Sequence, residues 1–169
     1  MRRVYVVSGA RADDLIAFGD RSRSPWRVEI AKYALASSSP AAVVKLNGER
    51  ILITERSVAA VDCERTALAL LGKMQSAPAA ARGTARIEGI EFQVAGMAGA
   101  PVKIRVGSYR DATVIDVESA AGEDEAIASE IVRTAVAGLR LEEIEVHAES
   151  FKVSAGSIQH AALKYARLV

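Results

Sequence analysis

The stretch 21–62 constrains the fold of this chain more than any other part of the sequence. Its first half has the composition of a helix with a marked beginning at Ser24 and Pro25. Serine caps the free backbone amides at a helix start, and proline at the first helical position loses no hydrogen bond. Pro40 predicts the end of this helix, because a residue that precedes proline is driven out of the helical region.

The second half of the stretch predicts a strand, a tight turn and another helix. Residues 41–53 are rich in apolar residues and contain Asn47-Gly48, a strong turn signal. The alanine-rich segment 54–74 is expected to be largely helical, and a final helix carries His160. Further strands are expected at 3–7, 84–94, 102–109 and 112–118, the last two as a hairpin around Arg110-Asp111.

A candidate internal repeat relates residues 28–71 to residues 127–168. In both segments an amphipathic stretch of helical period is followed by a short apolar strand and an alanine-rich helix. Such self-similarity is typical of a duplicated supersecondary unit. The alternative is that two amphipathic helices of similar composition simply look alike. If the repeat is real, the two segments should superpose as helix, strand and helix.

Length and composition indicate one domain or two small ones. A chain of 169 residues that is 50% hydrophobic can bury a proper core. No apolar run approaches the roughly 20 residues that span a membrane, and the N-terminal residues lack the apolar stretch of a signal peptide. The single Cys63 allows neither an internal disulfide nor a cysteine-based metal site. These features favour a cytoplasmic protein with no membrane association, no metal and no cofactor.

Charge is distributed unevenly along the chain. Residues 1–110 hold 17 Lys and Arg against 10 Asp and Glu, a net of +7, whereas residues 111–169 hold 5 against 11, a net of −6. We therefore expect a basic unit at 1–110 and an acidic unit at 111–169 that packs against it, or one compact domain built from both. The basic part favours a polyanionic partner, unless the two halves only neutralise each other.

The order of these elements resembles that of the Alba family of small nucleic-acid-binding proteins. The matching features are the arginines and Pro25 before the first helix, a basic loop after the second strand, and Ala-Val-Asp at 60–62. The sequence of residues 103–108 is also typical of that family's third strand, although it lies late in this chain. The resemblance covers mainly 1–110. It implies an α+β fold, an α/β sandwich in which a βαβαββ unit is followed by a second, truncated βαβα repeat.

The resemblance also implies sequence-independent binding to the phosphate backbone of DNA or RNA, in an architectural or RNA-associated role. Helix N-termini attract phosphate through their free amides and dipole, and arginine offers a planar fork that suits phosphate oxygens. The candidate nucleic-acid-binding residues are Arg21, Arg23, Arg27, Lys45, Arg50, Arg82 and Arg86. Taken singly, each of these residues is better explained as a solvated surface charge. Trp26, beside them, suits stacking on a base or, more commonly, packing at the edge of the core.

Catalytic motifs are not recognisable in the sequence. His147 and His160 are its histidines, and no carboxylate is placed to orient Ser157 and His160 as a triad. Phosphate loops and metal-binding spacings are absent from the sequence as well. We therefore expect a protein that is not an enzyme. One alternative is a protein-interaction subunit of a larger complex, in which the two repeats form an internal pseudo-dimer; such a subunit would bind a protein partner or form a homo-oligomer. The other alternative is a small α/β enzyme.

Overall fold

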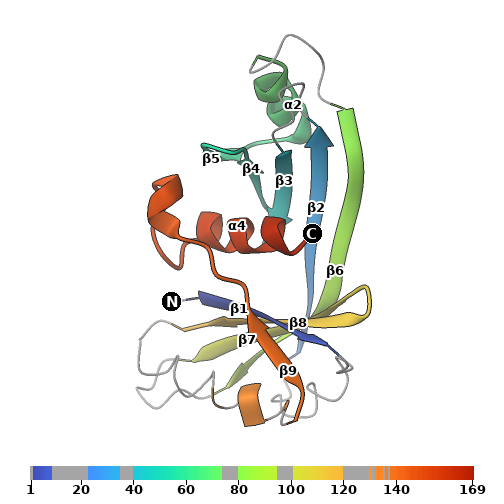
Figure 1. Cartoon of the computed structure of the whole chain (residues 1–169), viewed down its shortest axis with the longest axis vertical. Coiled ribbons are helices and arrows are strands. Elements are labelled where there is room, and N and C mark those ends of the chain that lie inside the picture. Colours follow the sequence, from blue (N-terminus) through green and yellow to red (C-terminus); the bar gives the residue numbers. More distant parts are fainter. Residues whose placement is uncertain are drawn as a thin grey trace. The chain divides into compact units, whose positions relative to one another are not determined.

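The structure, a computed structural model, describes residues 2–8, 23–34, 40–73, 80–94, 101–119, 130, 132–134, 136 and 138–169. Nine strands of this part of the chain form one sheet in the order β5-β4-β3-β2-β6-β7-β8-β1-β9. The strands are β1 (Arg2–Ser8), β2 (Ser24–Ala34), β3 (Pro40–Leu46), β4 (Glu49–Ile53), β5 (Val58–Val61), β6 (Ala80–Val94), β7 (Val102–Tyr109), β8 (Ala112–Glu118) and β9 (Arg140–Glu143). The helices are α2 (Glu64–Lys73), the 3-10 helix η1 (Ala148–Phe151) and α4 (Ile158–Leu168) (Figure 1).

This large sheet corrects the expected α/β sandwich. Residues 24–34, predicted as the first helix, form β2. Trp26, Val28 and Ile30 are buried, whereas the residues between them are exposed or only partly covered. Burial with a period of two is characteristic of a strand, and a proline close to the start of a strand is tolerated there. The Ser-Pro pair that predicted a helix start therefore lies at the beginning of a strand.

The internal repeat is also wrong. Residues 28–71 contain most of β2, three further strands and then most of α2. The described residues of 127–168 contain a short helical piece at 132–134, β9, η1 and α4. The element orders differ, so the two segments do not superpose as helix, strand and helix. The predicted βαβαββ unit and its truncated copy are absent from the described residues.

Local turn signals predicted the hairpins correctly. Asn47 and Gly48 connect β3 to β4 with φ values of 51° and 84°, as a tight turn between paired strands requires. The hairpin of β7 and β8 has the predicted bounds, and Arg110 in its turn has a φ of 53°. These connections depend on a few neighbouring residues, and the sequence predicts them for that reason.

The described chain divides into two compact units that interleave along the sequence. Unit 1 takes residues from 1–27, 87–145 and 155–157, and unit 2 takes residues from 28–86, 146–154 and 158–169. The division at residue 110 that charge suggested stays a prediction. No helix of the described chain is long and apolar enough to cross a membrane.

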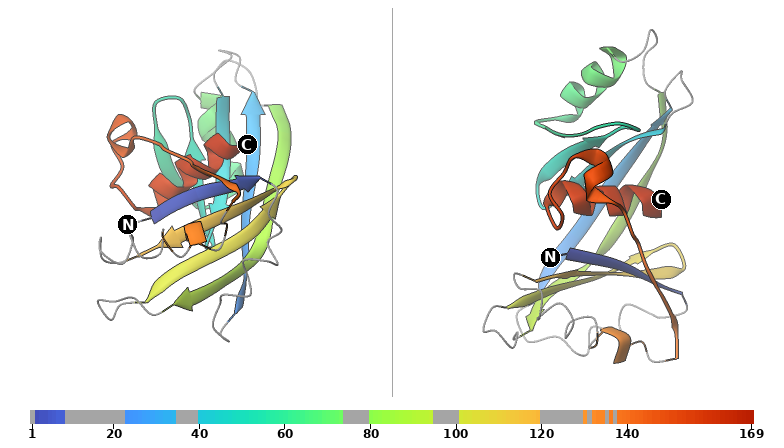
Figure 2. Two further views of the ribbon diagram at one scale, coloured as in Figure 1. Left: turned by 60° about the horizontal axis from the view of Figure 1, so that its bottom comes forward. Right: turned by 60° about the vertical axis from the view of Figure 1, so that its left-hand side comes forward.

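In unit 1 the strands β7, β8, β1 and β9 lie side by side in antiparallel pairs, with the C-terminal half of β6 next to β7 (Figure 2). One face of these strands packs an apolar core. Its buried members are Tyr5, Val7, Phe92, Val102, Ile104, Val106, Ile115, Val117, Val132 and Val136. The other face of the same strands carries charged residues.

In unit 2 the strands β2 to β5 pack against two helices. Val43 and Leu52 face the side of α2, where they share a core with Ala67 and Leu71. The next residues along these strands point to the opposite face by the alternation of a β-strand, and α4 packs against β3, β4 and β5 there. Tyr33 Oη donates a hydrogen bond to Glu64 Oε1 at 2.8 Å. Burial and this hydrogen bond raise the pKa of Tyr33 to about 12.

Gly89 and Gly107 face each other on β6 and β7, where a side chain has no room. A Cβ at Gly89 would overlap the Val106 carbonyl oxygen, and one at Gly107 would lie 2.7 Å from Trp26 Cζ3. We expect Gly89→Ala to lower the free energy of unfolding, measured with urea, by roughly 1–3 kcal/mol or more, because backbone must shift. The control is Gly72→Ala in α2, which has open space around it. It should raise stability by up to about 1 kcal/mol, and equal effects of the two variants would contradict this packing.

Candidate functional site

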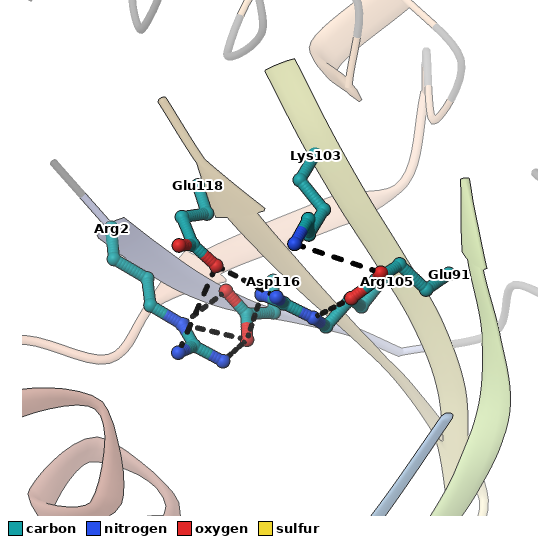
Figure 3. Close-up of polar contacts among 6 residues, drawn as sticks. All are labelled: Arg2, Glu91, Lys103, Arg105, Asp116 and Glu118. Atoms are coloured by element: carbon teal, nitrogen blue, oxygen red, sulfur yellow. Dashed lines mark hydrogen bonds and ion pairs between the residues drawn. The ribbon is translucent and has the colours of Figure 1, made fainter. Parts of the chain in front are cut away.

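Six charged side chains gather on one face of unit 1, and we call them the charged network (Figure 3). Its members are Arg2 on β1, Glu91 on β6, Lys103 and Arg105 on β7, and Asp116 and Glu118 on β8. Side chains two residues apart in a strand share a face, and the pairs of members on β7 and on β8 have this spacing. The strand register then sets cations opposite acids: Arg105 lies opposite Asp116 and Glu91, while Arg2 and Lys103 lie opposite Glu118.

Arg105 is the centre of the charged network. It is fully buried, and its guanidinium contacts all three carboxylates. Nε donates to Glu91 Oε2 at 2.5 Å, and Nη2 donates to Glu118 Oε2 at 2.7 Å. Nη1 lies 3.4 Å from Asp116 Oδ2. The three hydrogen-bonded acids offset the cost of removing this charge from water.

Arg2 and Asp116 form the other buried part of the network. Arg2 Nε donates to both oxygens of Asp116 at 2.9 Å, and Nη2 makes a further, shorter contact with Oδ2. Arg2 Nη1 also lies 4.0 Å from Glu118 Oε2. Asp116 therefore holds two arginines at once, and its side chain has no exposed surface.

The other members of the network reach solvent. The side chain of Glu118 is 42% exposed and that of Lys103 is 35% exposed. Glu91 is 22% exposed, and its Oε1 lies 3.8 Å from Lys103 Nζ. The network thus has a buried floor of Arg2, Arg105 and Asp116 and an outer rim that a ligand can reach.

The charges of the network influence one another's ionisation. Burial alone lowers the pKa of Arg105, but the charges of Asp116 and Glu118 raise it above its ordinary value. Burial alone raises the pKa of Glu118, but the hydrogen bond and charge of Arg105 bring it below its ordinary value. With three cations and three carboxylates, the formal charges of the network sum to zero. In the described residues, no three His, Cys, Asp or Glu side chains form a group that could hold a metal ion by themselves.

The residues proposed from sequence lie elsewhere, and three of them are in exposed ion pairs. Arg21 lies outside the described residues, and Arg23 and Arg82 are exposed. The remaining contacts are Arg27 Nε to Glu88 Oε1 at 3.5 Å, Lys45 Nζ to Glu29 Oε2 at 3.5 Å, Arg86 Nη2 to Glu29 Oε1 at 3.4 Å, and Arg50 Nη1 to the Asp62 carbonyl oxygen at 3.3 Å. Lys45, Arg50 and Arg86 do meet, because all three line a cavity of about 470 Å³ in unit 2. Trp26 is buried among the residues of the core.

Sequence reasoning missed the charged network, although a signal for it exists. In Lys103-Ile104-Arg105-Val106 and in Ile115-Asp116-Val117-Glu118, charged residues alternate with branched apolar ones. An ordinary half-buried strand has the same pattern. Arg105 and Asp116 stand out only once the register is known, since a cation and an acid then fall opposite each other in mid-strand.

No protein-family model matches the sequence, and no curated protein matches it. Several solved structures are similar. PH1819 from Pyrococcus horikoshii is 10% identical, with 89% of this chain and 97% of that chain covered and a TM-score of 0.49. HpAC1 from Hippeastrum, described as a candidate adenylyl cyclase that reveals a dominant triphosphatase activity, is 10% identical over 99% of this chain and 95% of that chain, with a TM-score of 0.49. The inorganic triphosphatase NE1496 is 11% identical over 75% of this chain and 77% of that chain, with a TM-score of 0.35.

These findings correct three expectations. Likenesses at such identities and scores carry no argument about the chemistry of this chain, but the neighbours named here are not Alba proteins. The Alba resemblance is therefore wrong, and β2 occupies the place of the helix on which it depended. Nucleic-acid binding is wrong with it: the helix N-terminus that was to hold phosphate is the start of a strand, and three of the candidate residues, Arg27, Lys45 and Arg86, are paired with acids. The expectation of a protein that is not an enzyme is corrected too: two of these neighbours are described as having triphosphatase activity, a description that applies to them and not to this chain.

Removing the shared acid of the network tests its effect on stability. Asp116→Asn leaves Arg2 and Arg105 buried without their common carboxylate, which should cost about 3–5 kcal/mol of unfolding free energy. The matched control is Glu88→Gln, whose pair with Arg27 is exposed, and it should cost less than about 1 kcal/mol. Urea unfolding measures both, and a small loss in Asp116→Asn would mean that the arginines regain solvent.

Acid titration tests the coupling of Glu118 to Arg105. A carboxyl group whose folded-state pKa is depressed adds stability above its unfolded value of about 4.3, and this stability is lost as pH falls through the folded-state pKa. Wild type should exceed Glu118→Gln at neutral pH by no more than about 1 kcal/mol, because solvent screens the exposed carboxylate. The two stability curves should then converge between about pH 5 and about pH 3. Curves that stay parallel would rule out the coupling.

Proposed function

We propose that the charged network binds the metal complex of a small phosphate compound and hydrolyses a phosphate anhydride in it. This proposal is supported by the ion pairs that three cations form with three carboxylates on one face of the sheet. Two arginines lie in the buried floor of the network and a lysine lies in its rim. Arginine binds phosphate oxygens in a planar, bidentate way, and lysine binds them as a mobile point charge. We also propose a cytoplasmic location for this activity.

The balance of charge favours a metal–phosphate complex over a bare anion. Arg105 and Arg2 are engaged by acids, so a phosphate alone would have to displace carboxylates without offering them a new partner. A divalent cation that arrives with the phosphate attracts Glu91 and Glu118. The nitrogens of Lys103 and Arg105 that these two acids hold then become available to the phosphate oxygens, while Asp116 keeps Arg105 in place. Mg²⁺ is commonly held by one or two carboxylates together with substrate phosphates and water. The two acids nearest to solvent supply that number.

The same residues suit hydrolysis of the bound anhydride. In this reaction water adds to a phosphorus atom and the bridging P–O bond breaks, with negative charge shifting to the leaving phosphate. Enzymes accelerate phosphoryl transfer mainly by positioning the groups and by stabilising this charge with fixed cations. Arg2 and Arg105 are fixed by burial and by hydrogen bonds to Asp116, so little reorganisation is needed when charge develops.

Hydrolysis of inorganic triphosphate with Mg²⁺ or Mn²⁺, followed as phosphate release, tests the proposal. Lys103→Met and Glu118→Gln should each lower the rate at least about tenfold, because each removes a rim charge that contacts the complex. The matched control is Lys45→Met, whose ammonium is similarly exposed and lies 3.5 Å from Glu29 in unit 2. This variant should retain the wild-type rate.

Calorimetry of the folded wild-type protein decides the binding step. Inorganic triphosphate should bind with Mg²⁺ present and bind much more weakly when the metal is chelated. If a folded protein neither binds the metal complex nor releases phosphate, the network is a structural ion-pair core and the proposal fails.

A further inference from the structure

Unit 2 contains a second cavity, of about 610 Å³, beside α4. Its walls come from the ends of β2 and β3 and from β4, β6, η1 and α4. Most of the wall is apolar and includes Ala42, Ile53, Phe151, Leu163 and Ala166. Small-molecule sites in proteins typically measure about 300–1,000 Å³ and have mainly apolar walls with a few polar groups. Size and lining thus both fit a small ligand.

Small residues line the cavity both on β3 and on α4 itself. Ala42 and Ala166 lie where larger aliphatic side chains would fill the space. Beside them, the pairing of β2 with β3 stops at Ala34, the last residue of β2, and Pro40, the first residue of β3. The cavity is open to solvent on one side, and most of its wall is apolar. A ligand with an apolar body would therefore remove this apolar wall from water.

The charged residues of the cavity are mostly basic. Lys32, Arg82 and Arg167 line it against the single acid Glu55. They come from β2, β6 and the last turn of α4, so segments distant in the sequence contribute the same sign of charge. A ligand with one negative group gains attraction from this basic side, whereas a ligand with a positive group is repelled.

We propose that this cavity binds an amphipathic anion, an alkyl chain of medium length that ends in a single carboxylate or phosphate. The chain lies along the aliphatic wall formed by Ala42, Ile53 and Leu163, and the anionic head contacts Lys32 and Arg82. The site is independent of the charged network and of its proposed hydrolysis, because every residue that lines it belongs to unit 2.

Titration calorimetry with decanoate, decanol and decylamine tests the choice of head group. Decanoate should bind at least tenfold more tightly than decanol, and decylamine should bind least. Each methylene from octanoate to dodecanoate should raise the affinity about fourfold until the cavity is full. Decyl phosphate is the arm that separates the two anionic heads: a preference for it over decanoate assigns a phosphate head, and the reverse preference a carboxylate.

Two variants with matched controls test the location. Arg82→Gln should weaken decanoate binding several-fold and leave decanol binding unchanged, while Arg65→Gln, on an exposed part of α2, should change neither. Ala166→Phe should fill the cavity and abolish binding of both ligands, while Ala69→Phe, exposed on α2, should not. Arg82 is exposed, so its variant keeps the test valid even if Ala166→Phe does not fold.

Three outcomes would overturn the proposal. One is an affinity that does not depend on chain length, and another is equal binding of decanoate and decylamine. The third is loss of binding in the α2 control variants to the same extent as in the cavity variants. Each of these would mean that the ligands adsorb to the surface and do not enter the cavity.

Discussion

The buried guanidinium of Arg105 is the interaction on which the structure of unit 1 depends most. A positive charge with no exposed surface is tolerated only if acids surround it with good hydrogen bonds. Glu91 on β6 and Asp116 and Glu118 on β8 provide these bonds. A shift of one residue in either pairing would turn those acids to the opposite face, where the apolar core lies. The charge on Arg105 therefore selects the register of three strands.

This arrangement is not the most stable one that such a sheet permits. Well-packed apolar residues of similar size often replace a buried ion pair without loss of stability, and sometimes with a gain. The strands already present apolar residues on their other face, so Val, Ile or Leu at these positions would fit the same sheet. Arg2 and Asp116 are buried on the charged face nevertheless. Because apolar residues could fill these positions, the charge retained there makes the network a reasonable place to look for binding chemistry.

The sequence predicted those parts of the fold that local residues determine. Asn47-Gly48 and the 102–118 hairpin follow from turn chemistry and alternation, and both are as predicted. The prediction of a first helix was wrong because Ser24-Pro25 satisfies the rule for a helix start. The alternating burial of Trp26, Val28 and Ile30 is instead that of a strand. That alternation was present in the sequence, but the pairing with β3 that makes it decisive is a long-range interaction. Resemblance to a known order of elements then extended one local error to the whole topology.

The candidate site was missed for a related physical reason. Basic residues that stand out in the sequence, such as Arg27 and Arg86, form exposed ion pairs at 3.5 and 3.4 Å, where water screens most of the charge. In the sequence, Arg105 stands between Ile104 and Val106, as a charged residue does in an ordinary half-buried strand. Because it is buried, its charge interacts far more strongly with neighbouring charges than an exposed one does. The effect of a cation depends on how much water surrounds it, and burial is a property of the folded sheet. Counting arginines along a chain therefore locates positive charge but not the places where that charge acts strongly.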